Sequence, residues 1–329
     1  MTVIENGSLP VVLVTQMPSD AWIEGLAVRP NGRVLTARLD QPEVYSFLAE
    51  DSNAAPELLC TFPGSNGVMN ICPLKGCHDE YAVLTATINL AKSQFSNFVV
   101  WRMALQSGSG SGSSPAPEPV KIAAIPDAGS ILSLTAATER IVLLADSAKH
   151  CIWQLDIETG VSSVLISDDS MKIKSAGDFF GLNRMRVADS FVVFTNTSAG
   201  TICKFPFGLE ADHLRATGPV ETAANDVVDC DGWAMTNGKG TFYLANYMDG
   251  FLWRLDVDPV SAEATTTVVL TDLVSPTAVE VVDVNGQPKL FVVCCGQIDV
   301  GWVKERVSWN DINAAVQVTV TTEEVVEAA

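Results

Sequence analysis

Six positions in the chain carry residue types that could bind an ion or stabilise a developing charge. Each lies at the start of a similar β-rich segment, and the six are Glu24, Asn70, Leu132, Asn183, Asp231 and Thr277. Two carboxylates, two amides and a hydroxyl are costly to bury together unless they bind an ion, a substrate or ordered water. Oxygen ligands of this kind suit a hard cation such as Ca²⁺. In the alternative interpretation, these groups cap strand starts and hydrogen-bond to water.

The same residues could also act without a metal. Their hydrogen-bonding groups would then contact a developing oxyanion or an enone oxygen of the substrate. The catalytic candidates in that case are Asn70, Asn183, Asp231 and Thr277. This interpretation requires no cofactor, whereas the first requires Ca²⁺ or another divalent cation.

Other kinds of catalytic site find little support in the sequence. The three histidines, His78, His150 and His213, are far apart and belong to no HExxH motif. This pattern disfavours zinc hydrolysis and a Ser-His-Asp triad. The sequence contains no GxSxG elbow, no Walker loop and no GxGxxG after a strand, so a serine hydrolase or a nucleotide cofactor is not indicated.

The elements that must position these residues are short strands. Runs rich in Val, Ile, Leu and aromatic residues recur, separated by turns such as Asn31-Gly32 and Asp249-Gly250. The six equivalent positions recur about every 48 residues, apart from one gap that is lengthened by the Gly/Ser/Pro-rich segment 106–119. Six such copies predict an all-β fold, a six-bladed β-propeller with four-stranded blades.

In this fold residues 1–329 form one domain, and segment 106–119 is a flexible loop inserted between blades two and three. The β-rich runs 11–15 and 315–322 lie near the two chain ends. One of them is expected to complete a blade and close the ring, which removes an exposed sheet edge. A two-domain β arrangement is the alternative.

The net charge and the hydropathy of the chain limit the kinds of binding partner that are expected. The chain has 39 Asp and Glu against 20 Lys and Arg, a formal net charge of −19. Such a surface disfavours binding to nucleic acid or to an anionic membrane. The apolar runs are too short for a membrane helix, and the first residues do not read as a signal peptide. A cytoplasmic, monomeric protein with a small-molecule substrate is therefore expected.

Four segments carry a resemblance to a known family. They are E-G-L-A-V-R-P-N-G-R at Glu24–Arg33, L-A-D-S with I-W-Q-L-D and T-G in Leu144–Gly160, F-T-N-T-S-A-G-T-I at Phe194–Ile202, and D-G-W-A-M at Asp231–Met235. At these residues the chain resembles the SMP-30/gluconolactonase/LRE-like (calcium-dependent phosphotriesterase) superfamily over about residues 20–300. The resemblance implies one divalent cation held by Glu24, Asn183 and Asp231, which would polarise a carbonyl or phosphoryl oxygen.

The chain departs from the family at the third blade. Relatives often have an Asn where this sequence has Leu132 within Ile131–Leu134. The central funnel of the expected propeller, on which the equivalent positions converge, is therefore predicted to be more apolar than a sugar-lactone site. Residues expected to line the substrate site are Trp22, Met69, Asn89, Leu132, Phe180, Asn196, Trp233, Asn246 and Tyr247. The opening I-E-G-L-A-V-R-P-N-G and the F-T-N-T segment are most similar to a fungal natural-product branch that includes hetero-Diels–Alderases.

Three functions remain open at this point. The favoured one is a cofactor-independent cyclase of fungal terpenoid or polyketide biosynthesis, which binds an apolar substrate and forms an oxygen heterocycle by hetero-Diels–Alder or related chemistry. The second is a Ca²⁺-dependent lactonase or ester hydrolase. The third is a non-catalytic binding propeller, although the chain lacks the WD and kelch signatures of such repeats.

Overall fold

A computed structural model describes most of the chain. The described residues are 3–6, 9–17, 21–48, 55–92, 94–105, 116–178, 180–236, 240–257, 264–284, 287–295 and 314–319. They are predominantly β-strand, with two short 3-10 helices, η1 (Leu90–Lys92) and η2 (Asp169–Met171). No helix in the described ranges is long and apolar enough to cross a membrane.

The described strands form six sheets. The first contains β3 (Ile23–Val28), β4 (Arg33–Arg38), β5 (Glu43–Leu48) and β6 (Glu57–Thr61). The second contains β7 (Gly67–Pro73), β8 (Glu80–Asn89), β9 (Gln94–Ala104) and β10 (Val120–Ala124). The third contains β11 (Ile131–Ala136), β12 (Ile141–Asp146), β13 (Cys151–Asp156) and β14 (Ser162–Ser167).

The other three sheets follow along the chain. The fourth contains β15 (Leu182–Ala188), β16 (Phe191–Asn196) and β17 (Thr201–Glu210), with β18 (His213–Ala216) and β19 (Glu221–Ala224) both paired to β17. The fifth contains β20 (Cys230–Met235), β21 (Thr241–Asn246), β22 (Phe251–Val257) and β23 (Ala264–Leu270). The last joins β24 (Pro276–Val284), β25 (Gln287–Cys294) and β26 (Ala314–Thr319) to β2 (Leu9–Gln16) and β1 (Val3–Asn6).

These sheets confirm the prediction of an all-β propeller built mainly from antiparallel four-stranded blades. The burial of the strands explains why the sequence reads as apolar runs. β12 is buried at all six positions, because the second strand of a blade is covered on both faces. β14, the outermost strand of the same sheet, has no fully buried residue.

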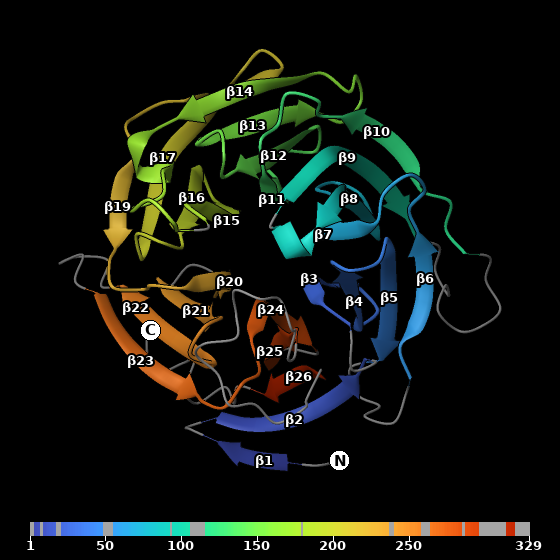
Figure 1. Cartoon of the computed structure of the whole chain (residues 1–329), viewed down its shortest axis with the longest axis vertical. Coiled ribbons are helices and arrows are strands. Elements are labelled where there is room, and N and C mark those ends of the chain that lie inside the picture. Colours follow the sequence, from blue (N-terminus) through green and yellow to red (C-terminus); the bar gives the residue numbers. More distant parts are fainter. Residues whose placement is uncertain are drawn as a thin grey trace. The chain divides into compact units, whose positions relative to one another are not determined.

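The chain divides into two compact units, which are described separately. Unit 1 comprises the chain up to residue 36, residues 45–58 and the chain from residue 230, and unit 2 comprises residues 37–44 and 59–229. Within unit 1, the first strands β20, β24 and β3 pack side by side. Within unit 2, the first strands β7, β11 and β15 do the same, and their sheets extend outward from them (Figure 1).

The segment 106–119 lies elsewhere in the topology than predicted. β9 and β10, which flank it, pair antiparallel in one sheet. It therefore joins the third and fourth strands of the second blade and does not connect the second blade to the third. Residues 106–115 lie outside the described part of the chain, and residues 116–119 have no regular secondary structure.

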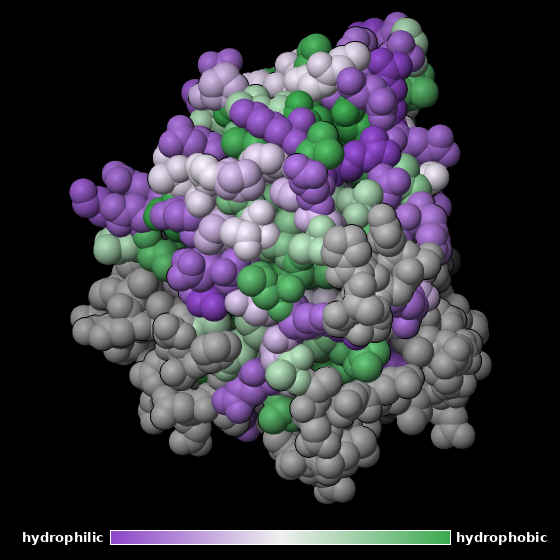
Figure 2. Space-filling model, turned by 90° about the vertical axis from the view of Figure 1, so that its right-hand side faces the viewer, coloured by the Kyte–Doolittle hydropathy of each residue, from purple (hydrophilic) through white to green (hydrophobic). Residues whose placement is uncertain are grey.

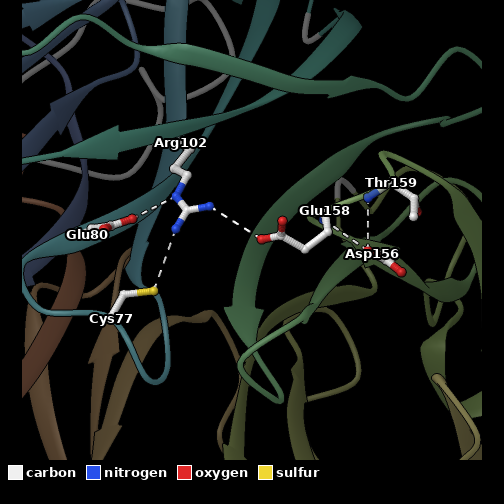
Figure 3. Close-up of polar contacts among 6 residues, drawn as sticks. All are labelled: Cys77, Glu80, Arg102, Asp156, Glu158 and Thr159. Carbon is white, nitrogen blue, oxygen red and sulfur yellow. Dashed lines mark hydrogen bonds and ion pairs between the residues drawn. The ribbon is translucent and has the colours of Figure 1, made fainter.

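An ion-pair network joins two sheets of unit 2 (Figure 3). Arg102 on β9 donates from Nε to Glu80 over 2.7 Å and from Nη1 to Glu158, in the turn after β13, over 3.4 Å. A third contact joins its Nη2 to the Sγ of Cys77 over 3.8 Å. Asp156 accepts hydrogen bonds from the backbone N–H of Glu158 and of Thr159, which fixes the turn that presents Glu158 to Arg102.

The surface is mixed in character. On the face drawn in Figure 2, hydrophilic residues are interspersed with hydrophobic ones, and the hydrophobic atoms form small separate patches. The large hydrophobic residues that are exposed among the described ones, such as Val120, Val161 and Leu209, come from different strands and turns. Isolated apolar residues of this kind are normal on a protein surface.

Candidate functional site

The first strand of five sheets carries a register shift, and four of these shifts lie at positions picked out by the sequence repeat. The residues at the shift are Met69, Leu132, Asn183 with Arg184, Asp231 with Gly232, and Thr277. A β-bulge of this kind breaks the alternation of a strand and re-aims the side chain at the bulge.

One position of the repeat was assigned wrongly from the sequence. Asn70 was expected at the equivalent position of the second sheet, but it pairs directly with Leu84, one residue beyond the shift. Met69 occupies the bulge and is 3% exposed. At this position the second sheet therefore has a thioether in place of an amide. With Leu132, this makes two of the equivalent positions of the repeat apolar.

Unit 1 brings two of the predicted acidic residues close to a partly buried tyrosine, Tyr247. Burial raises the pKa of the Tyr247 hydroxyl well above its ordinary value. Electrostatic interactions raise it further, and in decreasing order of effect the neighbours are Cys295, Glu24 and Asp231. A hydrogen bond with Ser275 opposes the shift. Tyr247 therefore stays protonated at neutral pH and is available as a neutral hydrogen-bond donor.

The thiol of Cys295 senses the same two carboxylates. Burial raises its pKa well above the ordinary value, and Glu24 and Asp231 both add to the shift, whereas a hydrogen bond with Ser275 lowers it. Because Tyr247 and Cys295 both interact with the two carboxylates, these side chains belong to one group. We call Glu24, Asp231, Tyr247, Ser275 and Cys295 the Tyr247 cluster.

Strand ends from different sheets assemble the Tyr247 cluster. Glu24 lies in β3 and Asp231 in β20, Tyr247 follows β21, Ser275 precedes β24 and Cys295 follows β25. Ser275 has a positive φ of 50°, which is uncommon outside glycine, and its carbonyl accepts a 2.9 Å hydrogen bond from the backbone N–H of Cys295. The backbone thus holds the Ser275 hydroxyl against both neighbours.

Sequence reasoning missed two members of this cluster. The two are Ser275 and Cys295, neither of which is among the residues expected to form the site. Cys295 is buried, with 1% exposure. Its relation to Tyr247 depends on the end of β25 reaching the start of β24, which no local sequence signal announces. The conspicuous signal was the unusual Ser-Pro-Thr start of the sixth repeat.

Two other predicted residues of unit 1 have structural roles. Thr277, which is fully buried, donates its hydroxyl hydrogen to the Ile23 carbonyl over 2.7 Å and so ties β24 to β3. Trp233 is 1% exposed and packs its ring against Phe242 at a centroid distance of 5.6 Å. Both contacts stabilise the packing of the first strands that carry Glu24 and Asp231.

The predicted residues of unit 2 form a separate group. Asn183 donates from Nδ2 to the Thr197 hydroxyl over 2.9 Å, and its carbonyl accepts a 2.7 Å hydrogen bond from Ser133. The carbonyl of the neighbouring Leu132 accepts a contact from Arg184 Nη1 at 3.4 Å. These contacts fix the bulges of β11 and β15 against each other.

Three predicted substrate contacts are used in turns. Asn196 Oδ1 accepts from the backbone of Ala199, and its Nδ2 donates to two carbonyls of the β14–β15 connection. Asn246 Oδ1 accepts from the Asp249 N–H over 2.6 Å, and Asn89 Oδ1 accepts from the Lys92 N–H over 3.2 Å. Such side-chain caps explain why Asn recurs at strand ends, and a substrate contact for these residues stays a prediction.

The carboxylates of the Tyr247 cluster offer oxygen ligands to a cation. Within the described residues, no group of three His, Cys, Asp or Glu side chains is arranged as a metal site. The donor chemistry of Glu24 and Asp231 nevertheless fits a hard cation such as Ca²⁺, which takes carboxylate and amide oxygens. The third residue implied by the family resemblance, Asn183, belongs to unit 2.

Comparison with known proteins shows which solved structures have a similar fold. No model of a known family matches the chain, and no curated protein matches its sequence. Among solved structures, luciferin-regenerating enzyme is similar with a TM-score of 0.65 and 12% identity, over 94% of this chain and 95% of that protein. The likeness is one of fold.

Two further structures are similar to the same extent. The calcium-binding protein regucalcin from Agrobacterium tumefaciens has a TM-score of 0.61 and 11% identity, over 91% of this chain and 90% of that one. The PQQ-bound aldose sugar dehydrogenase from Streptomyces coelicolor has a TM-score of 0.60 and 14% identity, over 97% and 99%. One fold thus accompanies different chemistries, and function has to be argued from the site.

Proposed function

We propose that the protein is a non-redox enzyme that closes an oxygen heterocycle on a small apolar natural product, by a hetero-Diels–Alder or related reaction. The observation that carries this proposal is the position of Tyr247, which is partly buried beside Glu24 and Asp231 and whose pKa is raised mainly by burial. A neutral phenol in a desolvated site donates a strong hydrogen bond to a carbonyl oxygen whose negative charge grows in the transition state. Such a donor accelerates a hetero-Diels–Alder step, which transfers no proton or electron and releases no leaving group.

Each residue of the Tyr247 cluster has its own role in this proposal. Tyr247 donates to the carbonyl oxygen of the enone or quinone-methide partner. Ser275 holds the Tyr247 hydroxyl, and Trp22 donates from Nε1 to the Glu24 carboxylate over 2.9 Å. Ser275 and Cys295 are buried, and the other three residues of the cluster are only partly exposed, which limits the water that would otherwise add to a reactive quinone methide.

A second part of the proposal concerns the number of propeller blades. We infer that the sheet of β24, β25, β26, β2 and β1 acts as a sixth blade, with strands from both chain ends. In its support, β26 pairs with β25 on one side and with β2 on the other. Joining the two ends of the chain in one blade leaves fewer open sheet edges in a propeller.

The test uses a reaction whose uncatalysed product is racemic. An ortho-quinone methide is generated in buffer together with a trisubstituted alkene, and the chroman product is analysed by chiral chromatography. The protein, previously dialysed against a chelator, is expected to give an excess of one enantiomer. A racemic product at the uncatalysed rate would contradict the proposal.

A second candidate, a Ca²⁺-dependent lactonase or ester hydrolase, is favoured by the pairing of Glu24 with Asp231. Both carboxylates act on the same buried groups, and their mutual repulsion would be relieved by a cation. Glu24 and Asp231, both in unit 1, would hold the ion, which would supply Lewis-acid activation of a lactone carbonyl. Hydrolysis of glucono-1,5-lactone or an aryl acetate that is abolished by chelation and by Glu24→Gln would support this candidate.

A further inference from the structure

The hairpin of β8 and β9 projects beyond the other strands of its sheet. β7 pairs with β8 as far as Ala86, and β10 pairs with β9 only from Val99 to Arg102. The pairs from Thr87↔Ser96 to Asn89↔Gln94 therefore form a two-stranded arm without a third described strand. η1 lies at its tip.

The base of this arm is held rigidly. Asn66 donates from Nδ2 to the Ile88 carbonyl over 2.9 Å, and its Oδ1 accepts from the Ile88 N–H over 2.6 Å. Ile88 is paired with Phe95 across the arm. The two hydrogen bonds from one side chain replace the missing neighbouring strand, so Phe95 is presented on a fixed backbone.

Phe180 is presented from the opposite side by the connection between β14 and β15. Its carbonyl accepts a 3.0 Å hydrogen bond from the Ser198 N–H, and the next residue, Gly181, donates to the Ser147 hydroxyl over 3.1 Å. The turn that holds Phe180 also contains Thr197, the hydroxyl of which accepts from Asn183. Phe180 thus lies close to the bulge of β15.

The two rings meet across the sheet that separates them. Phe95 and Phe180 have centroids 6.4 Å apart and an interplanar angle of 51°. Their sheets pack through β7 and β15 against β11, which lies between them. Both rings remain partly exposed, although an aromatic pair gains most when it is fully covered.

We propose that Phe95 and Phe180 form a binding subsite for the planar, conjugated part of an apolar substrate. This inference rests on the proposed function, because the small apolar substrate is taken from it. A planar group needs roughly 7 Å between two flanking rings to reach carbon–carbon contact with both, and these centroids are 6.4 Å apart and tilted. The ligand consequently stacks on the exposed side of the pair and does not slip between the rings.

The test measures binding of trans-chalcone, a planar enone, by equilibrium dialysis, with its saturated analogue dihydrochalcone as a comparison. Wild-type protein is expected to bind trans-chalcone in preference. Phe95→Ala and Phe180→Ala are each expected to weaken that binding about tenfold and to abolish the preference. The double variant is expected to be little worse than either single variant, because the two rings act as one surface.

A matched control distinguishes the loss of an aromatic ring from a general disturbance of the β8–β9 arm. Gln94→Ala changes an exposed residue beside Phe95 on the same arm and is expected to bind as wild type. Unchanged binding in both phenylalanine variants, an equal loss in Gln94→Ala, or no binding of trans-chalcone by the wild-type protein would overturn the subsite. Enantioselectivity lost in Tyr247→Phe, with binding unchanged in Phe95→Ala, would overturn the subsite alone and leave the proposed function standing.

Discussion

Trp22 donates its indole hydrogen to the carboxylate of Glu24 over 2.9 Å. Trp22 immediately precedes β3, and Glu24 is the second residue of that strand. The indole therefore orients an acid of the Tyr247 cluster from the segment that enters the strand. This gives Trp22 a positioning role, where the sequence predicted a direct substrate contact that stays untested.

Replacing Trp22 by Phe is expected to loosen Glu24 while keeping an aromatic side chain in place. Loss of a hydrogen bond to a charged group costs about 1.5–3 kcal/mol of folding free energy, measurable by urea unfolding. The enantiomeric excess of the chroman product is expected to fall, because the carboxylate beside Tyr247 loses its fixed orientation. Unchanged stability and selectivity would contradict the claim that Trp22 orients Glu24.

Gly232 is expected to tolerate no side chain. A Cβ at this position would lie 2.4 Å from the Thr277 carbonyl oxygen and 2.4 Å from the Ala278 Cα, both in the backbone of β24. Gly232→Ala is expected to cost about 1–3 kcal/mol, because β20 and β24 must separate. Gly208→Ala is the control, since its Cβ would meet only the Thr217 methyl group at 3.2 Å. Equal melting temperatures for the two variants would contradict this packing.

Alkaline pH is expected to destabilise the fold. Burial raises the pKa of Cys294 to about 12 and raises those of Cys295 and Tyr247 well above their ordinary values. These groups stay protonated in the folded protein but ionise when unfolded, so stability is complete below the unfolded-state pKa values and falls as pH rises past about 8.5. Melting temperatures between pH 7 and 11 test this, and Cys295→Ala is expected to flatten the decline. A melting temperature that stays constant up to pH 11 would contradict it.

Acid is expected to weaken one ion pair of unit 2. Burial alone would raise the pKa of Asp156, but the hydrogen bond from Arg140 at 2.7 Å, with those from the Thr159 and Glu158 N–H groups, lowers it below its ordinary value. A lowered pKa stabilises the fold above about pH 4, the unfolded-state value, and this stabilisation is lost as pH falls further. Arg140→Gln is therefore expected to melt lower than wild type at pH 7 and to approach it near pH 3. A constant difference between the two proteins would contradict this assignment.

The repeat in the sequence predicted the blades because each blade uses similar turns and apolar strands. It also located Leu132, Asn183, Asp231 and Thr277 at the bulges. The error at Asn70 arose because a bulge moves the equivalent position by one residue, and a polar residue next to Met69 looked like the better match. Only the pairing register of β7 and β8 separates the two.

The parts of the site that sequence reasoning missed depend on tertiary structure. Ser275 and Cys295 reach Tyr247 because the end of β25 returns to the start of β24. Phe95 meets Phe180 because the β8–β9 hairpin is longer than its neighbours. Asn196 and Asn246 looked functional because Asn is also the residue that caps these turns. A single residue type served two roles, and only the contacts distinguish them.

The central claim is that Tyr247 acts as a neutral hydrogen-bond donor in a ring-closing reaction. The most direct measurement compares the enantiomeric excess of the chroman product made by wild-type protein and by Tyr247→Phe, both treated with a chelator and both checked for native circular dichroism. The account predicts a clear excess for the wild type and a nearly racemic product for the variant. Equal enantiomeric excess from the two proteins would contradict it.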